Sequence, residues 1–312
     1  MSRVQCVEVQ CRTALNRVEG MPFRWSVNPY SGCTHSCHYC YARAYYARAE
    51  HGNADGDFES KIYVKQNMPG VLERELARRS WRGEQVALGT STDCYQPIEG
   101  RYRLTRAVLE VLVAHQNAAG LVTKAPLVLR DLDLWAALAR VAKVRIHFTV
   151  TTLDLAVWRQ VEPGTPNPRR RLEAVRRLNA AGVPAGVLLA PILPGITDSE
   201  ESIEAIVAAA AEYGAVSFGA GALRLAPGVR DHYLRWLGEA RPELVARYER
   251  AYQGTYAPRD YLERLNGRVD RLRARYGFAE DTMRQRQLVP TASGGEPSQP
   301  ARRGRQLALP LG

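Results

Sequence analysis

The strongest constraint on the fold is a regular alternation between residue 23 and about residue 225, where short β-branched runs alternate with longer stretches of helical periodicity. Such alternation is typical of βα units that build a parallel sheet. The expected strands cover residues 23–30, 85–90, 120–124, 144–152, 185–193 and 215–223. The expected helices between them cover residues 43–50, 104–116, 132–142, 169–181 and 199–213. Six units are fewer than the eight of a closed α/β barrel, so we predict a partial (β/α)6 barrel over residues 23–225.

The sequence on either side of this barrel predicts three further regions. Residues 1–22 form an N-terminal segment. Beyond Pro227 the pattern is wholly helical, with expected helices at residues 233–237, 242–253 and 261–276, which we interpret as a helical extension over residues 226–289. Residues 290–312 are rich in Pro, Gly, Ser and Arg, a composition that buries too little apolar surface to offset the entropy of ordering. We predict a disordered tail there.

Composition and charge narrow the class of partner. No apolar stretch approaches the roughly 20 residues that cross a bilayer, and the first ten residues have no apolar signal-peptide core, so we expect a cytoplasmic protein without a membrane partner. The net charge of +11 favours polyanionic partners such as DNA. Codon bias in a GC-rich genome is the alternative, because almost all of the 43 basic residues are arginine.

Three cysteines follow the first expected strand closely, in the order Cys33-x3-Cys37-x2-Cys40. A loop after a strand can fold three thiolates around one iron-sulfur cube, and such cubes normally take four cysteines. Three ligands leave one iron open for a chelating ligand. Zinc is the alternative, because His35 and His38 could complete a tetrahedral site, but no second doublet of ligands lies nearby in the sequence.

The spacing C-x3-C-x-aromatic-C, with Tyr39 as the aromatic residue, resembles the defining loop of the radical S-adenosylmethionine (radical SAM) superfamily. The segments HYCYAR, TSTD, VTK, HFTVTT, VEPGT and APILPG resemble, in matching order, its spore photoproduct lyase-like branch, also described as DNA repair photolyase-like. The resemblance implies a radical SAM barrel, a [4Fe-4S] cluster on Cys33, Cys37 and Cys40, and S-adenosylmethionine at the open iron. It also implies a 5′-deoxyadenosyl radical as the reactive species and a reductase such as flavodoxin or ferredoxin as electron donor.

The same resemblance assigns five residues to the cofactor. Thr92 would meet its amino acid end, Lys124 its carboxylate and Thr149 its ribose hydroxyls, while Ala190 and Tyr39 would contact the adenine. Each position also has a purely structural interpretation. Thr149 suits a strand, Thr92 a turn and Ala190 a packed core, and Lys124 could be a solvated strand end. Their common place at the ends of expected strands favours the functional interpretation.

One position departs from the family pattern. Thr90 stands where spore photoproduct lyases have a hydrogen-donating cysteine, and a threonine hydroxyl bond is far too strong to replace a thiol. Cys94 lies in the same loop and is a candidate catalytic residue, although loop cysteines without an activating environment are more often inert. The paired tyrosines of the family match Tyr39 and Tyr41, so Tyr41 is the second catalytic candidate, with packing as its alternative role.

These features lead to three hypotheses of function. The first is a radical SAM enzyme, lyase-like, that acts on a nucleic-acid base or a DNA lesion. The second keeps the radical chemistry but gives it a peptide or small-molecule substrate. The third is a non-enzymatic zinc or cluster protein that binds nucleic acid.

The extreme C-terminus suggests a further partner. Residues 306–311, QLALPL, resemble the QL-x-L-x-L peptides by which bacterial replication and repair proteins dock on the DNA sliding clamp. Leu307, Leu309 and Leu311 would enter an apolar groove while Gln306 would hydrogen-bond at its rim. A chance match in a leucine-containing tail is the alternative.

Overall fold

The computed structural model describes residues 4–21, 23–48 and 55–278. The clamp-like peptide, the whole of the tail predicted at residues 290–312 and the last part of the predicted helical extension lie outside the described residues. No helix among the described residues is long and apolar enough to cross a membrane.

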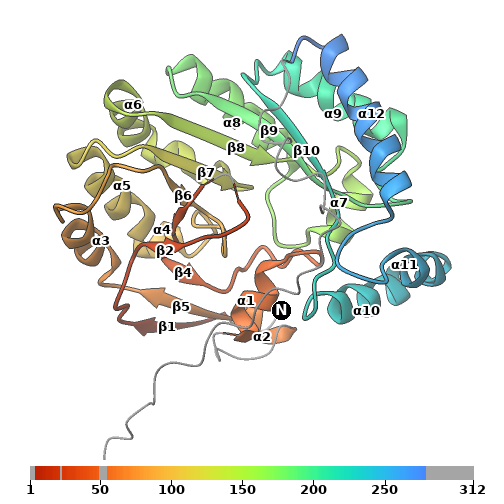
Figure 1. Cartoon of the computed structure of the whole chain (residues 1–312), viewed down its shortest axis with the longest axis horizontal. Helices are drawn as coiled ribbons and strands as arrows, with labels where there is room; N and C mark the ends of the chain where they lie inside the picture. The colour runs from red at the N-terminus through yellow and green to blue at the C-terminus, as the bar shows by residue number, and fades with distance from the viewer. Residues whose placement is uncertain (1–3, 22, 49–54, 279–312) are drawn as a thin grey trace, which may run out of the picture.

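The main sheet confirms the predicted partial (β/α)6 barrel. Its strands lie in the order β10-β9-β8-β7-β6-β3-β2, and all neighbours are parallel except β2 and β3. The six parallel strands coincide with the six that the sequence predicts. The sheet curves around the centre of the molecule with helices on its outer face (Figure 1). The strands are β2 (Asn16–Arg17), β3 (Trp25–Val27), β6 (Val86–Leu88), β7 (Ala119–Thr123), β8 (Val144–Thr149), β9 (Ala185–Ile192) and β10 (Phe218–Ala222).

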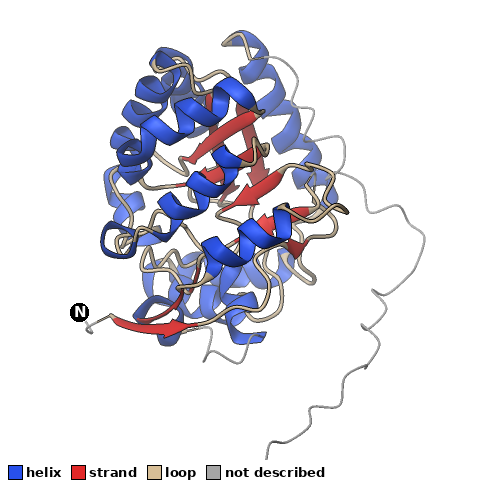
Figure 2. Cartoon of the chain, turned by 90° about the vertical axis from the view of Figure 1, so that its left-hand side faces the viewer, coloured by secondary structure: helices blue, strands red, loops and turns tan. Residues whose placement is uncertain are grey.

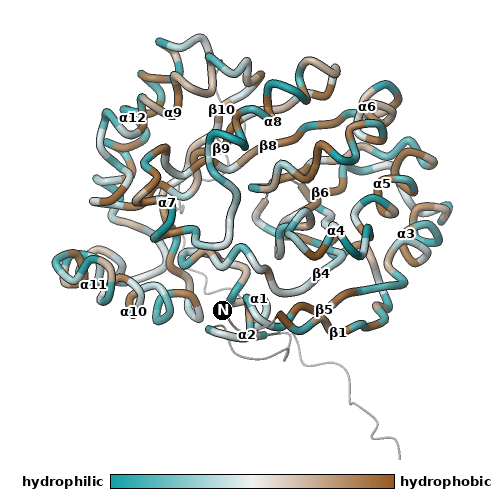
Figure 3. The backbone as a smooth tube through the Cα atoms, turned by 180° about the vertical axis from the view of Figure 1, so that it is seen from behind, coloured by the Kyte–Doolittle hydropathy of each residue, from teal (hydrophilic) through white to brown (hydrophobic). Residues whose placement is uncertain are grey.

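Amphipathic helices cover the outside of the barrel, as Figure 2 shows in a view from the side. Leu109 and Leu112 of α5 and Trp135 and Leu138 of α6 are buried against the strands, where burial of apolar area is the main stabilising term. Figure 3 shows apolar residues along β5 and β8. The helices are α3 (Met68–Leu76), α4 (Glu99–Tyr102), α5 (Leu104–Ala114), η1 (Pro126–Asp131), α6 (Leu132–Val141), α7 (Leu155–Val161), α8 (Pro168–Ala180) and α9 (Glu200–Glu212).

A second, smaller sheet is absent from the sequence-based prediction. It consists of β1 (Gln5–Val9), β5 (Lys61–Lys65) and β4 (Tyr30–Ser31), with β5 in the middle. Strand β5 follows two short helices, α1 (Ala42–Arg48) and α2 (Gly56–Ser60), and alternates between buried and half-buried residues. The N-terminal segment therefore adds β1 to this small sheet and β2 to the barrel.

The predicted helical extension has two parts with different packing. Helices α10 (Arg230–Ala240) and α11 (Val245–Ala251), joined by η2 (Pro242–Leu244), place Tyr233 and Tyr248 in an apolar cluster that includes Cys37 and Tyr39. The last helix, α12 (Arg259–Arg275), instead lies along α9, and its Leu265 joins the core of the barrel (Figure 1). The extension thus covers the barrel beside β10 and packs against the cysteine loop.

Candidate active site

The three cysteines lie on one tightly wound loop after β4. The Cys33 N–H donates to the Phe58 carbonyl at 2.8 Å, and two successive turns follow, in which Ser36 N–H donates to Cys33 and Cys40 N–H donates to Cys37. Ser36 has a φ of 54°, a left-handed conformation that reverses the chain between the first two cysteines. Cys33 and Cys37 are buried, whereas Cys40 is half-buried.

The surroundings of the thiols disfavour their charged form without a counter-charge. Burial, the Asp93 carboxylate and Cys40 raise the pKa of Cys33 well above its ordinary range. Burial raises the pKa of Cys37 to about 12, with Glu162 and Cys40 adding to the rise and Lys124 opposing it. Since the three sulfurs are close enough to repel as thiolates, a positively charged group between them would stabilise all three.

The VEPGT segment holds this loop from the other side. His38 N–H donates to the Val161 carbonyl at 3.2 Å, and Gly164 N–H donates to the His35 carbonyl at 3.1 Å. A Cβ atom at Gly164 would lie 2.2 Å from the Thr34 carbonyl oxygen, so only glycine permits this close approach of two backbones. The segment therefore fixes the position of the cysteine loop.

The two histidines of the loop point to different surroundings. His35 Nδ1 lies 3.2 Å from Asp93 Oδ2, in a position not aligned for a hydrogen bond. His38 Nδ1 lies 3.3 Å from His232 Nε2 on α10, and its ring stacks on Trp236. Over the described ranges, no three His, Cys, Asp or Glu side chains are grouped to hold a single metal ion.

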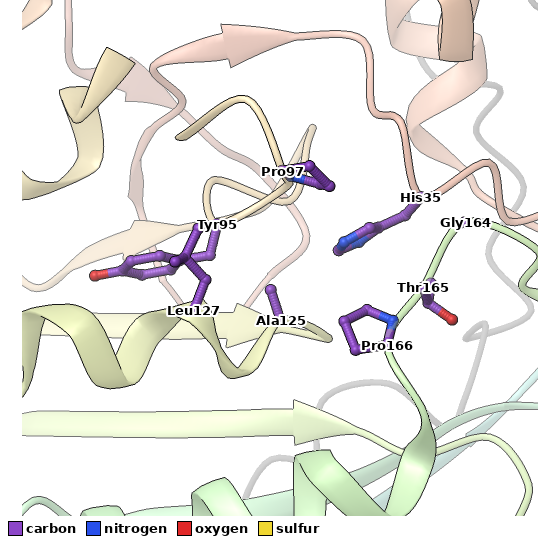
Figure 4. A pocket seen from close by; sticks show the side chains of 8 residues that line it. All are labelled: His35, Tyr95, Pro97, Ala125, Leu127, Gly164, Thr165 and Pro166. Carbon is purple, nitrogen blue, oxygen red and sulfur yellow. The ribbon is translucent and has the colours of Figure 1, made fainter. Parts of the chain in front are cut away.

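His35 also lines a cavity of about 220 Å³ behind the cysteine loop. Figure 4 shows its ring directed into this cavity between Pro97 and Pro166. Burial raises the pKa of Asp93, but His35, the Lys124 N–H and the Thr123 hydroxyl outweigh it and lower that pKa to about 2. Asp93 is thus a fixed anion that links the loops after β6 and β7 to the cysteine loop.

A buried charged network lies beneath Tyr39. The Tyr39 hydroxyl donates to Glu162 and lies 3.1 Å from the Thr151 hydroxyl. Arg171 Nη2 donates to the same carboxylate at 2.6 Å, and both side chains are fully buried. Burial raises the pKa of Glu162, but Arg171, Lys124, Tyr39 and Thr151 together lower it to about 2. Glu162 is therefore ionised and orients the Tyr39 ring.

Lys124 lies directly after β7, with its ammonium nitrogen 5.6 Å from the centre of the Tyr39 ring. Burial lowers its pKa, but Cys37 and Glu162 raise it more, so the net pKa is above its ordinary value. Thr92 donates to the Gly32 carbonyl at 2.7 Å and accepts from Gln96 at 3.0 Å. Both residues therefore stand at the cysteine loop, as a cofactor site at the carboxyl edge of the sheet requires.

The other two predicted cofactor residues lie on the neighbouring strands. Thr149 ends β8, and its carbonyl accepts from Arg171 Nη1 at 2.9 Å. Ala190 lies in β9 and is partly exposed. Because β6, β7, β8 and β9 are adjacent and parallel, all four predicted contacts other than Tyr39 lie at one edge of the sheet.

The two predicted catalytic residues differ in placement. The Tyr41 residue is 50% exposed, and its hydroxyl donates to the Thr90 carbonyl just after β6. Burial of that hydroxyl and the Cys40 and Tyr45 side chains raise its pKa, and the nearby Arg224 charge partly opposes this. Cys94, in contrast, is 0% exposed within the apolar core, and its thiol pKa is raised well above the ordinary value, chiefly by burial. This placement does not favour the catalytic role predicted for Cys94.

Comparison with known proteins agrees with this geometry. A family model described as the radical SAM superfamily matches residues 27–207, more than half of the chain. This chain belongs to the radical SAM superfamily. An uncharacterized protein of Mycobacterium tuberculosis is 41% identical over 278 residues, which cover 88% of this chain and 82% of that protein. An uncharacterized protein of Methanocaldococcus jannaschii is 25% identical over 199 residues, which cover 64% of this chain and 72% of that protein.

Two solved structures share the fold of this chain. A mutant of spore photoproduct lyase with bound AdoMet and dinucleoside spore photoproduct matches with a TM-score of 0.67 and 20% identity, over 87% of this chain and 79% of that one. Streptococcus suis SuiB bound to its precursor peptide SuiA matches with a TM-score of 0.51 and 13% identity, over 88% of this chain and 47% of that one. The resemblance to the radical SAM superfamily is therefore confirmed, and the fold is shared with spore photoproduct lyase.

The radical SAM superfamily uses a [4Fe-4S] cluster and S-adenosylmethionine, and the residues present fit both. The donor set is three thiols on one loop, whereas Cys6, Cys11 and Cys94 lie on other parts of the described chain. The positively charged iron-sulfide core would supply the counter-charge that the buried thiolates need. Lys124 at the same loop offers a cation to the carboxylate of the cofactor.

Glu162, Arg171 and Asp93 belong to the site, although none of them was predicted as a site residue from the sequence. Glu162 belongs to the VEPGT segment, one of the segments that resemble the family, so this motif could have indicated a role for Glu162. Arg171 is one of three consecutive arginines at the start of α8, and nothing in the sequence distinguishes the buried one from its neighbours.

Proposed function

We propose that this radical SAM enzyme acts on a nucleic-acid base or a DNA lesion. The observation that carries the proposal is the common position of the three thiols, Lys124 and Tyr41 around one edge of the barrel. The net charge of +11 and the shared fold with spore photoproduct lyase, which was solved with a dinucleoside, support a nucleic-acid substrate.

In this proposal, Cys33, Cys37 and Cys40 hold the cluster, and the five predicted residues hold the cofactor. When bound, the reduced cluster and S-adenosylmethionine would supply a 5′-deoxyadenosyl radical, the chemistry needed for hydrogen-atom abstraction from the substrate. Lys124 binds the cofactor carboxylate and Thr92 its amino acid end. Thr149 contacts the ribose, and Tyr39 and Ala190 contact the adenine, with Glu162 fixing the Tyr39 ring.

The return of a hydrogen atom needs a donor other than Thr90. Asn28 Nδ2 donates to Thr90 Oγ1 at 3.0 Å, and the Thr90 N–H donates to Asn28 Oδ1 at 3.1 Å, so the hydroxyl is held as part of a turn. Cys94 is enclosed by the core. Tyr41 is half-exposed beside Thr90 and carries a phenolic O–H, so we propose Tyr41 as the hydrogen-atom donor at that position. The phenoxyl radical left behind would regain its O–H with one electron from the proposed reductase and one proton from solvent.

Anaerobic reconstitution tests the proposal. Dithionite-reduced protein should cleave S-adenosylmethionine to 5′-deoxyadenosine and methionine, and an oligonucleotide that carries the right base or lesion should change the yield or be converted itself. A panel of lesion-bearing oligonucleotides, modified nucleosides and peptides separates the nucleic-acid substrate from the peptide or small-molecule alternative. If protein with a fully loaded cluster forms no 5′-deoxyadenosine, the proposed enzyme activity is wrong. If only the peptides of the panel are converted, the proposed nucleic-acid substrate is wrong.

The remaining partners belong to the same proposal. A cytoplasmic reductase such as flavodoxin or ferredoxin would supply the electron. Residues 306–311 would recruit the enzyme to DNA through the sliding clamp, by a peptide that lies outside the described residues.

A further inference from the structure

Three tyrosines have exposed rings at the edge of the active site. Tyr41 immediately precedes α1, Tyr45 lies on α1, and Tyr256 precedes α12. Their residues are 50%, 53% and 49% exposed, which places them among the few large apolar side chains on the described surface. Scattered exposed side chains need no explanation, but a group of them beside the candidate active site indicates a binding surface.

Two arginines accompany these rings. The guanidinium carbon of Arg48 lies 5.8 Å from the centre of the Tyr45 ring. The guanidinium carbon of Arg224 lies 4.8 Å from the centre of the Tyr256 ring, and Arg224 Nη2 also donates to the Tyr256 hydroxyl at 2.8 Å. Within the part of the chain that the structure describes, neither arginine forms a salt bridge. Their charges are therefore available to an anionic ligand.

The two halves of this group lie side by side. Gly228, in the segment between β10 and α10, has a φ of +86°, and a Cβ atom there would lie 3.5 Å from the Cβ of Ala44 on α1. An antiparallel bridge fixes Arg224, on the same segment as Gly228, against Tyr256. We call Tyr41, Tyr45, Arg48, Arg224 and Tyr256 the tyrosine–arginine rim.

The angle between two of the rings limits what the rim can bind. The centres of the Tyr41 and Tyr45 rings are 6.0 Å apart, and their planes meet at 88°. Bases in a duplex lie parallel and cover one another, so they cannot stack on two perpendicular rings. A single strand has free base faces and a backbone that can turn between neighbouring nucleotides.

We propose that the tyrosine–arginine rim binds single-stranded DNA beside the active site, with bases stacked on the tyrosines and phosphates on Arg48 and Arg224. The inference rests on the proposed function, from which it takes DNA as the polymer. The hydrogen bond from Tyr41 to Thr90 connects the rim to the end of β6, so a strand held there delivers one nucleotide to the barrel edge. Stacking tolerates any base, whereas chemistry at that edge selects the reactive one.

Fluorescence anisotropy on the full chain tests the rim. The probe is a labelled single strand of about 12 nucleotides, a length within the usual range of single-strand binding sites. We expect Tyr45→Ala and Tyr256→Ala each to weaken its binding about 10-fold, while Tyr45→Phe keeps the wild-type affinity because the ring remains. Arg224→Gln should lower the slope of log affinity against log salt by about 0.7, the value for one lost phosphate contact on a single strand. Arg79→Gln, an exposed arginine after α3, is the matched control and should change neither quantity.

Several outcomes would overturn the inference. Wild-type affinity in both alanine variants, with iron content and melting temperature also unchanged, would show that the rim does not bind the strand. A matched duplex or an RNA strand bound more tightly than the DNA strand would contradict the stated ligand. If the strand binds through the rim while no nucleic acid is converted, the rim is supported and the proposed function fails. If DNA is converted but the alanine variants bind normally, the proposed function is supported and the rim fails.

Discussion

Replacement of Arg171 by methionine tests the buried network under Tyr39. Arg171 and Glu162 are fully buried, and the guanidinium donates to the Glu162 carboxylate at 2.6 Å and to the Thr149 carbonyl at 2.9 Å. Removal of one partner from a buried ion pair typically costs about 3–5 kcal/mol. Lys124, Tyr39 and Thr151 still face the carboxylate, so we expect the lower end of that range.

The pKa of Glu162 gives an independent magnitude. It is about 2 in the folded protein against an ordinary value of 4.5, a difference that corresponds to about 3 kcal/mol of stability at neutral pH. Arg171 is the largest favourable contributor. A loss of about 3 kcal/mol lowers the melting temperature of a chain this large by about 6–12 °C.

Arg176→Met is the matched control for Arg171→Met. Arg176 lies on the same helix, α8, and pairs with Glu173 at the surface, where solvent screens the interaction. Thermal unfolding followed by circular dichroism should show a clear loss in Arg171→Met and no loss in Arg176→Met. Equal melting temperatures for the two variants would refute the reasoning.

The pH dependence gives a second readout for the same variant. Because the pKa of Glu162 is lowered on folding, its contribution is complete above about pH 4.5 and disappears as the pH falls towards 2. The difference in stability between wild type and Arg171→Met should therefore be largest at neutral pH and shrink below pH 4.5. Chemical denaturation of cluster-free protein at several pH values measures it, and a difference that grows in acid would contradict the sign.

Three further predictions concern the cofactors and the tail. Alanine at all three cluster cysteines should abolish bound iron and brown colour, whereas Cys6→Ala should keep both, and unchanged iron in the triple variant would disprove the ligand assignment. Lys124→Ala should weaken equilibrium binding of S-adenosylmethionine about 10- to 100-fold by loss of a charge-assisted contact, with the exposed Lys143→Ala as control, and equal affinities would exclude the role. A peptide of residues 302–312 should bind purified sliding clamp in fluorescence anisotropy, and an equal signal from its Gln306→Ala, Leu307→Ala variant would eliminate the clamp hypothesis.

The sequence by itself determined the barrel and the cysteine loop. Both are local patterns, since the alternation of strand and helix periodicity is set by neighbouring residues, and the spacing of Cys33, Cys37 and Cys40 lies within one loop. The end of each parallel strand lies at the same edge of the sheet, so Lys124 and Thr149 were also predicted to lie near the loop. By contrast, β1 and β5 pair across some fifty residues, and no local signal in the sequence indicated that pairing.

The tertiary structure alone decided which polar and reactive side chains are enclosed. Cys94 follows Thr92 by two residues, yet its thiol lies in the core while the Thr92 hydroxyl holds the cysteine loop. Arg171 is buried against Glu162, whereas its neighbours Arg169 and Arg170 are exposed. Burial depends on packing between segments distant in the chain, and burial fixes charge state and reactivity. A single sequence contains the residue types, but the surroundings that assign them a role exist only after folding.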